Sequence, residues 1–317
     1  MVLSIGFLGI GIILLIYGAR LLVDGGSSLA KRLGISPLVI GLTIVSFGTS
    51  APELVVNVVA SIRGSAEIVI GNVIGSNIMN LLLILGISAV IFPLKVQSST
   101  VWKEIPMSLL AALAVIIMAN DAFIDGLTLN ILSRSEGLVL LFFFIIFLYY
   151  TYGISKVVGE GPEVRVFGKG RSALMVLGGL TLLFLGGRAA VSGGVDIARA
   201  LGVSEALIGF TILAMGTSLP ELAASAVAAW RKQMDIAVGN VIGSNIFNIF
   251  FILGTSTVIS AVPFKSAFNL DLGVLLLGTL IAFLTLFVGK RHVFERWQGG
   301  VFVGLYVTYL AFIIARG

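Results

Sequence analysis

Long apolar runs recur from one end of the chain to the other, separated by short segments that carry glycine, proline and charged residues. A run of about 20 apolar residues is long enough to cross the hydrocarbon core of a bilayer as a helix. The pattern therefore predicts an all-α polytopic membrane protein with about ten transmembrane helices. The predicted spans cover residues 2–23, 37–62, 67–92, 104–120, 136–154, 172–198, 205–230, 235–262, 270–289 and 298–315.

Two stretches within these runs are copies of one another. Gly41–Asn80 and Gly209–Asn248 align without a gap at an offset of 168, and each contains GTS-x-PEL followed by GNVIGSN-I-x-N. With about five spans in each half, an odd number, the copies must cross the membrane in opposite directions, which makes them an inverted repeat. We therefore divide the chain into a first five-helix repeat at 1–154, a polar, glycine-rich cytoplasmic linker at 155–171 and a second repeat at 172–317.

The overall composition agrees with a membrane environment. Charged residues make up 11% of the chain and hydrophobic residues 58%, with a mean hydropathy of +1.13. A soluble domain carries about 25% charged residues, so a soluble globular protein is excluded. The absence of cysteine excludes a disulfide scaffold and thiolate metal sites. The formal charge of +5 does not indicate nucleic-acid binding, because Lys and Arg collect in the cytoplasmic loops of membrane proteins.

Basic residues also predict the orientation of the chain. If the N-terminus lies outside, the predicted inner loops hold Lys31, Arg32, Lys95, Lys103, Lys156, Arg165, Lys169, Arg171, Arg231, Lys232, Lys290, Arg291 and Arg296. The outer loops and the C-terminus then hold only Arg63, Arg134, Arg199, Lys265 and Arg316. This asymmetry predicts a multi-pass protein of the cell (plasma) membrane with both termini outside. The first apolar run has no basic segment before it, so we expect a spanning helix and not a cleaved signal peptide.

Each copy is predicted to contain a broken helix. Pro52 has no N–H and its ring clashes with the carbonyl of Gly48, and Pro220 with Gly216 repeats the arrangement. A break at this depth leaves backbone carbonyls that are tolerated only where they line an enclosed cavity or bind something. Broken helices at matching positions of two halves indicate a transporter binding site.

Side chains with oxygen atoms line up along the helices predicted in the two copies. Residues four apart share one face of a helix. The stripes formed in this way are Thr49, Glu53 and Asn57; Thr217, Glu221 and Ser225; Asn72, Ser76 and Asn80; and Asn240, Ser244 and Asn248. They contain neither His nor Cys, so they suit hard cations such as Ca²⁺ and Na⁺ better than zinc or copper.

Glu53 and Glu221 most strongly favour a binding role. A carboxylate inside a membrane helix is costly and by default marks an ion or substrate path. A structural one needs a basic partner, and no Lys or Arg is predicted at similar depth in these helices; a duplicated bundle without a transport role would leave both acids unexplained. The Ser, Thr and Asn positions have simpler alternatives, because they can bond their own backbone or join helices. The aspartates near predicted span ends are expected to be solvated or to cap helices: Asp24, Asp121, Asp125, Asp196 and Asp271.

The paired motifs resemble the two alpha-repeats of the calcium/cation antiporter superfamily, especially its prokaryotic sodium/calcium exchanger-like members. The resemblance is carried by GTSAPE ending at Glu53 with GSNIMN ending at Asn80, and by GTSLPE ending at Glu221 with GSNIFN ending at Asn248, and it covers essentially the full length. It implies that the sites lie between the second, third, seventh and eighth helices. Some relatives carry an aspartate where this chain has Asn248, and its absence argues against potassium dependence.

The resemblance also implies the ligands of the ions. Calcium would be held by Glu53, Glu221, Thr49 and Thr217, with backbone carbonyls near Ser46 and Ala214. Sodium would be held by Ser50, Ser76, Ser218 and Ser244 with the same carbonyls, and Asn80 and Asn248 would lie at the centre.

These observations together predict a secondary active antiporter, not an enzyme, that exchanges Ca²⁺ for Na⁺ by alternating access and exports calcium from the cytoplasm. Two ionised glutamates carry a local charge that one Ca²⁺ or two Na⁺ would neutralise, so only a loaded site would reorient. The alternative is a Ca²⁺/H⁺ exchanger that uses the same glutamates, because burial favours the protonated carboxyl group.

Two other classes fit less well. A passive channel would favour several subunits and an unbroken water path, and an intramembrane hydrolase would need a motif such as HExxH or a Ser–His set, which this sequence lacks. The expected partners are Ca²⁺, Na⁺ and the lipid bilayer, with no resident cofactor, no nucleic acid and no obligate protein partner.

Overall fold

The computed structural model describes residues 2–155, 165–203, 208, 212 and 214–316, and the elements in them are helical apart from four strands of two residues each. Those of the first repeat are α1 (Val2–Leu33), α2 (Pro37–Ile40), η1 (Gly41–Val45), α3 (Ser46–Thr49), α4 (Ala51–Ile62), α5 (Ala66–Ile78), η2 (Met79–Ile84), α6 (Leu85–Ile91), β1 (Leu94–Lys95), η3 (Thr100–Glu104), α7 (Ile105–Met118), α8 (Asp121–Ile124), β2 (Ile131–Leu132) and α9 (Arg134–Ile154). Those of the second are α10 (Lys169–Ala200), α12 (Ala214–Gly216), α13 (Leu219–Trp230), α14 (Met234–Ile246), η5 (Phe247–Leu253), α15 (Gly254–Ile259), β3 (Val262–Pro263), η6 (Ser266–Phe268), α16 (Asn269–Thr285), β4 (Val293–Phe294) and α17 (Arg296–Arg316). The segments η1, η2, η3 and η5 are π-helical, and η6 is a 3₁₀-helix.

Eight helices in the described part of the chain are long and apolar enough to cross a membrane. They are Leu3–Leu33, Ala66–Ile91, Thr100–Met118, Arg134–Ile154, Lys169–Ala200, Met234–Ile259, Ser266–Thr285 and Arg296–Arg316. Pro37–Thr49 and Ala51–Ile62 meet at an angle of 48° and make a ninth span if they are taken together. The all-helical, multi-pass class is thereby confirmed. The remaining predicted span, 205–230, begins in residues outside the described ones. Most of the predicted linker at 155–171 also lies outside them.

The first helix extends beyond the predicted span of residues 2–23, so the predicted end at residue 23 was wrong. Gly25 and the glycine and serines after it indicate a break, but α1 continues to Leu33. The cause is tertiary packing. A Cβ added at Gly25 would lie 3.0 Å from the carbonyl oxygen of Ser172 in α10, and Ser28 and Ser172 share a hydrogen bond of 2.8 Å. Close packing against α10 thus overrides the low helix propensity of glycine.

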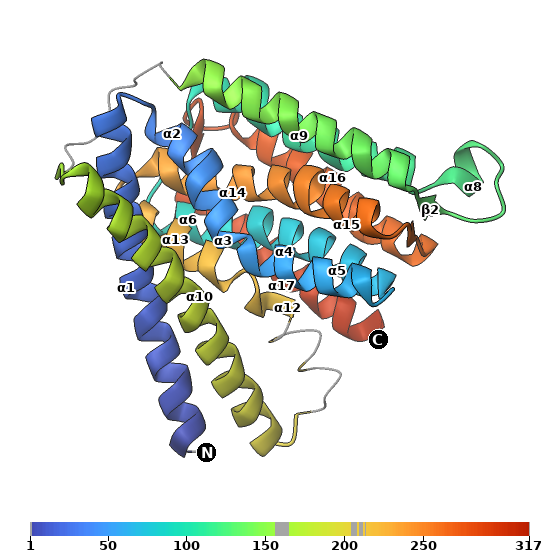
Figure 1. The fold of residues 1–317 in the computed structure, drawn as a ribbon, viewed down its shortest axis with the longest axis horizontal. Coiled ribbons are helices and arrows are strands. Elements are labelled where there is room, and N and C mark those ends of the chain that lie inside the picture. The colour runs from blue at the N-terminus through green and yellow to red at the C-terminus, as the bar shows by residue number, and fades with distance from the viewer. Residues whose placement is uncertain (1, 156–164, 204–207, 209–211, 213, 317) are drawn as a thin grey trace.

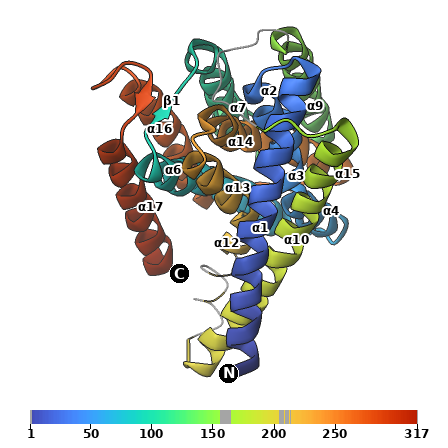
Figure 2. The same cartoon turned by 90° about the vertical axis from the view of Figure 1, so that its left-hand side faces the viewer.

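The two longest helices, α1 and α10, lie side by side and run in opposite directions (Figures 1 and 2). A Cβ added at Gly18 would lie 2.8 Å from the carbonyl oxygen of Gly179, and one added at Gly186 would lie 2.9 Å from that of Gly11. Gly179 and Gly186 are the counterparts of Gly11 and Gly18 at the offset of 168. Exchanging the two repeats therefore converts the Gly18–Gly179 contact into the Gly186–Gly11 contact. A two-fold axis that relates antiparallel copies requires this equivalence.

Two short strand pairs also join the repeats. Leu94 of β1 lies opposite Phe294 of β4, and Leu132 of β2 lies opposite Val262 of β3. Val262 follows Leu94 by 168 residues, whereas Phe294 follows Leu132 by only 162. The difference lies in the loop before the last helix of each repeat, which in the first repeat is longer and contains α8 (Figure 1).

Gly179→Ala is expected to destabilise the protein, because its Cβ would lie 2.7 Å from the backbone nitrogen of Leu22 and 2.8 Å from the carbonyl oxygen of Gly18. Overpacking costs roughly 1–3 kcal/mol. The thermal unfolding midpoint in detergent should therefore fall by several degrees, at about 2–4 °C per kcal/mol. Gly178→Ala is the matched control, since nothing lies within 4 Å of a Cβ there, and it should leave the midpoint unchanged or raise it. Equal midpoints for the two variants would contradict this packing.

Candidate cation-binding site

The predicted helix breaks are found at Ser50 and Ser218. Ser50 separates α3 from α4 with φ −82° and ψ 7°, and Ser218 precedes α13 with φ −91° and ψ 7°. Pro52 and Pro220 are each the second residue of the helix that follows. Proline is tolerated in a first helical turn because the backbone N–H groups there have no intrahelical acceptor. Both breaks therefore follow from the same local sequence.

Glu53 and Glu221 lie in the first turns of α4 and α13, and each is 1% exposed. Each accepts a hydrogen bond from the broken segment of the other repeat. Ser218 donates to Oε1 of Glu53 at 3.0 Å, and Ser50 donates to Oε1 of Glu221 at 2.8 Å. The positive end of the helix dipole also favours a carboxylate at these positions. The two acids therefore reach one site through reciprocal bonds between the repeats.

Several oxygen atoms of the two glutamates and of η2, α14 and η5 are buried and have no hydrogen-bond partner among the described residues. They are Oε2 of Glu53, Oε2 of Glu221, Oδ1 of Asn80, Oδ1 of Asn245, Oδ1 of Asn248 and Oγ of Ser244. A buried oxygen without a donor carries a desolvation penalty of about 1–3 kcal/mol, and more if it is charged. A bound cation would remove that penalty, because carboxylate, amide and hydroxyl oxygens are the ligands of Ca²⁺ and Na⁺.

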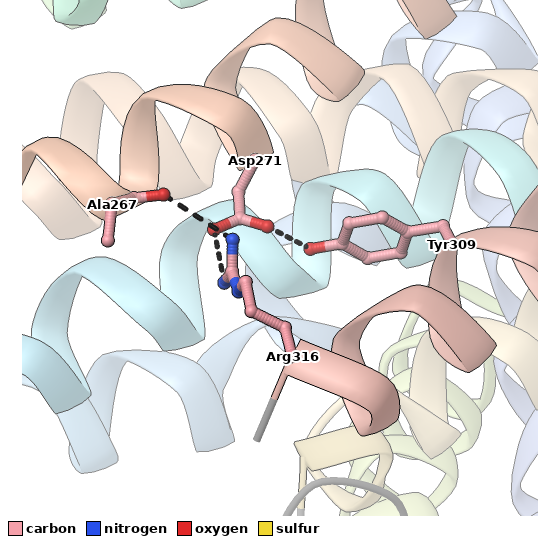
Figure 3. Close-up of polar contacts among 4 residues, drawn as sticks. All are labelled: Ala267, Asp271, Tyr309 and Arg316. Carbon is pink, nitrogen blue, oxygen red and sulfur yellow. Dashed lines mark hydrogen bonds and ion pairs between the residues drawn. The ribbon is translucent and has the colours of Figure 1, made fainter.

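A buried carboxylate with a structural role has different surroundings, as Asp271 shows. Tyr309 donates to Oδ1 of Asp271 at 3.0 Å, and Arg316 donates to Oδ2 at 3.0 Å (Figure 3). Asp271 is 4% exposed, so of its two expected roles, solvated or helix-capping, the first was wrong; it lies in the first turn of α16, and α17 packs over this turn and supplies both partners. The ion pairs formed within the described chain include neither Glu53 nor Glu221.

The threonines and the remaining serines of the stripes lie between the repeats. Thr49 donates to Oδ1 of Asn240 at 3.1 Å, and its counterpart Thr217 donates to Oδ1 of Asn72 at 3.4 Å. Ser76 donates to Glu53 at 3.4 Å and accepts from Ser218 at 3.1 Å. Fully buried Ser244 lies in α14. The structure thus joins residues from stripes that the sequence could only describe one helix at a time.

The backbone carbonyls of Ser46 and Ala214 were predicted to be freed by the helix breaks and to bind the cation. The carbonyl of Ser46 is not freed by the break, because it accepts the N–H of Ser50 at 3.0 Å. A carbonyl oxygen has a second lone pair that remains available to a cation. The Ser46 hydroxyl donates to the carbonyl of Gly41 at 2.6 Å. Ala214 is the first residue of α12.

The asparagines occupy the π-helical turns and the helices just before them. Asn80 lies in η2 and Asn248 in η5, and each is 1% exposed. Sequence reasoning missed Asn77 and Asn245. Their amide nitrogens donate to each other's backbone carbonyls at 3.3 Å, and Oδ1 of Asn77 also accepts from Asn248 at 3.0 Å. The available signal was the GSN triplet present in both copies, whose asparagine lies outside the four-residue stripes.

No group of three or more His, Cys, Asp or Glu side chains that could hold a metal ion is found in the described residues. A cation between the repeats would instead be bound by the two glutamates and by neutral oxygens. Such a donor set suits a hard cation that exchanges its ligands easily, and it is unlike the imidazole and thiolate sets of resident transition metals.

Comparison with known proteins places this arrangement in a class. The family model described as sodium/calcium exchanger protein matches residues 3–153 and 171–315. The putative antiporter CaxA of Alkalimonas amylolytica is 36% identical over 314 residues, which cover 96% of each chain. The inner membrane protein YrbG of Escherichia coli is 35% identical, over 99% of this chain and 97% of its own. The sodium/calcium exchanger MaX1 of Methanosarcina acetivorans is 30% identical over 95% of each chain.

A solved structure of the sodium-calcium exchanger NCX_Mj, soaked with Na⁺ and Ca²⁺, has the same fold. It is 35% identical to this chain, covers 98% of both and superposes with a TM-score of 0.83. These matches define a cation/calcium exchanger, which is a secondary transporter and not an enzyme. The chain belongs to the sodium/calcium exchanger protein family, and the resemblance inferred from the paired motifs is confirmed.

Asp271→Asn is expected to lower stability and leave cation exchange intact. The variant leaves Arg316 without its charged partner, and because the arginine side chain is 35% exposed the cost should be only about 1–2 kcal/mol. Thermal unfolding in detergent measures the change. Glu67→Gln is the control, since Glu67 and Lys265 form a pair in which both side chains are 65% exposed, and its midpoint should not move. Loss of exchange in folded Asp271→Asn protein would show that this acid is not purely structural.

Proposed function

We propose that this chain is an antiporter that exchanges Ca²⁺ for Na⁺ across the cell membrane. The observation that carries the proposal is the pair of buried glutamates, one from each repeat, each with an unpartnered oxygen and no ion pair within the described chain. Calcium would be bound by Glu53, Glu221, Thr49 and Thr217 with the carbonyls of Ser46 and Ala214. Sodium would be bound by Ser50, Ser76, Ser218 and Ser244 with the same carbonyls, and Asn80 and Asn248 would lie between the sites.

Charge neutralisation couples the two ions in this proposal. Two ionised glutamates that form no ion pair within the described residues need two positive charges, which either one Ca²⁺ or two Na⁺ supply. An uncompensated charge in such a low-dielectric space costs several kcal/mol. An empty site therefore cannot close and reorient cheaply, whereas a loaded site can. This difference converts binding into exchange and suppresses leak.

Access to the site differs between its two flanks, which supports an alternating mechanism. Thr49 and Asn240 on one flank are 0% exposed, whereas their counterparts Thr217 and Asn72 are partly exposed. Since the two-fold relation puts a threonine and an asparagine at matching positions of both flanks, a second conformation with the exposures exchanged is the natural partner state. Movement of the α1–α10 pair against the other helices would interconvert the two states.

The direction of transport follows from the orientation. The basic residues favour a cytoplasmic side that holds the loops after α1, α6 and α13, with both termini outside. YrbG is named an inner membrane protein, which supports a location in the cell membrane. The sodium gradient across that membrane would then drive calcium out of the cytoplasm.

A proton is the competing counter-ion, because a buried glutamate can also be neutralised by protonation. Purified protein in calcium-loaded liposomes separates the two hypotheses. An inward sodium gradient at equal pH should release calcium, and a pH gradient alone, without sodium, should not. Release driven only by the pH gradient would replace sodium with protons, and release with no gradient of either ion would indicate a channel.

Glu53→Gln and Glu221→Gln are each expected to lower the exchange rate at least 100-fold relative to the wild type, with little effect on folding. The reason is that removing one of the two charges leaves a bound Ca²⁺ uncompensated, at a cost of about 3 kcal/mol or more in binding free energy. Calcium flux in liposomes gives the rate, and gel filtration and thermal unfolding confirm the fold. Glu104→Gln is the matched control, because Glu104 is also fully buried and also has one unpartnered oxygen, but it lies in η3, outside the two copied stretches, and its other oxygen accepts a hydrogen bond from Tyr150. Exchange retained in either of the first two variants would refute the site.

A further inference from the structure

The two flanks of the site differ at one position of the aligned copies. Asn57 of the first repeat corresponds to Ser225 of the second at the offset of 168. On the second-repeat side the hydrogen bonds form an unbroken series from Thr49 through Asn240 to Ser225. Thr49 donates to Oδ1 of Asn240 at 3.1 Å, and Nδ2 of Asn240 donates to Oγ of Ser225 at 2.9 Å. The polar groups of this series are thus satisfied by one another.

On the first-repeat side the corresponding series of hydrogen bonds stops at Asn72. Thr217 donates to Oδ1 of Asn72 at 3.4 Å, but Nδ2 of Asn72 is buried and finds no acceptor among the described residues. Asn57 is 0% exposed, and both its Oδ1 and its Nδ2 lack partners within the same part of the chain. An unmade hydrogen bond at a buried amide carries a penalty of about 1–3 kcal/mol for each atom. No side chain in the described residues removes this penalty.

The chemistry of the unpartnered atoms selects their partner. Two are amide donors and one is an amide acceptor, so a cation would satisfy only the acceptor and an anion only the donors. A water molecule both accepts and donates, and buried waters typically make about three hydrogen bonds to such groups. Asn72 and Thr217 are partly exposed, so water can reach this flank, whereas Thr49 and Asn240 on the other flank are fully buried.

We propose that Asn57 and Asn72 hold one ordered water beside Thr217, and that a cation on this flank keeps this water in its coordination shell. The inference rests on the proposed function, since it assigns a role to a group next to the same ion site. Asn57 is then a positioning residue, because it acts through the water and through the Asn72–Thr217 hydrogen bond. One flank of the exchanger is hydrated and the other is dry, although the two repeats share a sequence motif.

An experimental structure tests the inference without any variant. At a resolution that shows waters, density within hydrogen-bond distance of Nδ2 of Asn72 and of the Asn57 amide is expected. Crystals soaked with Tl⁺, a heavy stand-in for a monovalent cation, should show no anomalous peak at that position. An anomalous peak there would overturn the inference in favour of a cation site, and a site without density would overturn it altogether.

Asn57→Ser tests the role of the water in transport. The smaller hydroxyl side chain reproduces the second repeat, so the series of hydrogen bonds should continue from Asn72 to this hydroxyl and displace the water. The calcium half-saturation concentration should rise about three- to tenfold at the membrane face reached from Thr217, the range expected when one ligand hydrogen bond is lost. At the opposite face it should change less than about twofold, which a general loss of stability would not produce.

Ser61→Ala is the control on the same helix. Ser61 is buried and its hydroxyl donates to the carbonyl of Asn57, one turn back, at 2.8 Å. Its half-saturation concentration should match the wild type at both faces. Unchanged values for Asn57→Ser, in protein whose wild type exchanges calcium for sodium, would overturn the inference alone. Wild-type protein that shows no such exchange would refute the proposed function, and the density at Asn57 would still decide whether the water is present.

Discussion

Two serine–glutamate hydrogen bonds between the repeats determine what this molecule can do. Glu53 accepts from Ser218 and Glu221 from Ser50, so each repeat supplies the acid for one bond and the donor for the other. Neither repeat can form the site alone. The ion pairs of the described part of the chain include neither acid, which is why the proposed function balances their charges with bound cations. Ionisable residues inside a membrane by default mark an ion path, which is the basis of the proposed exchange.

The local features of the site were predictable because they depend on residues near one another in the chain. The offset of 168 revealed the repeat, the prolines revealed the breaks now found at Ser50 and Ser218, and the four-residue spacing placed Glu53 on a polar face. The class of fold needed no more than the apolar runs. The bonds between the repeats could not be predicted, since the Thr49–Asn240 and Thr217–Asn72 bonds each join residues that lie more than 100 positions apart in sequence.

The failures of prediction have the same physical origin. Residues 25–28 have the composition of a loop, and packing of Gly25 against α10 and of Gly26 against Ile40 keeps them helical. Asp271 looks like a surface residue until α17 brings Arg316 and Tyr309 over it. The difference between Asn57 and Ser225 is visible in the aligned copies, yet its meaning depends on which partners the surrounding helices provide. In each case tertiary packing, and not local propensity, decides the outcome.

The strand pairing has a consequence for how the protein is made. Leu94 pairs with Phe294, and Leu132 with Val262, so each small sheet needs strands that leave the ribosome far apart in time. A nascent first repeat therefore carries an unbalanced glutamate and unpaired strand edges until the second repeat has been inserted. Non-local pairing of this kind is slow to form. The sheet that joins β1 to β4 is complete only after β4, which directly precedes α17, has been synthesised.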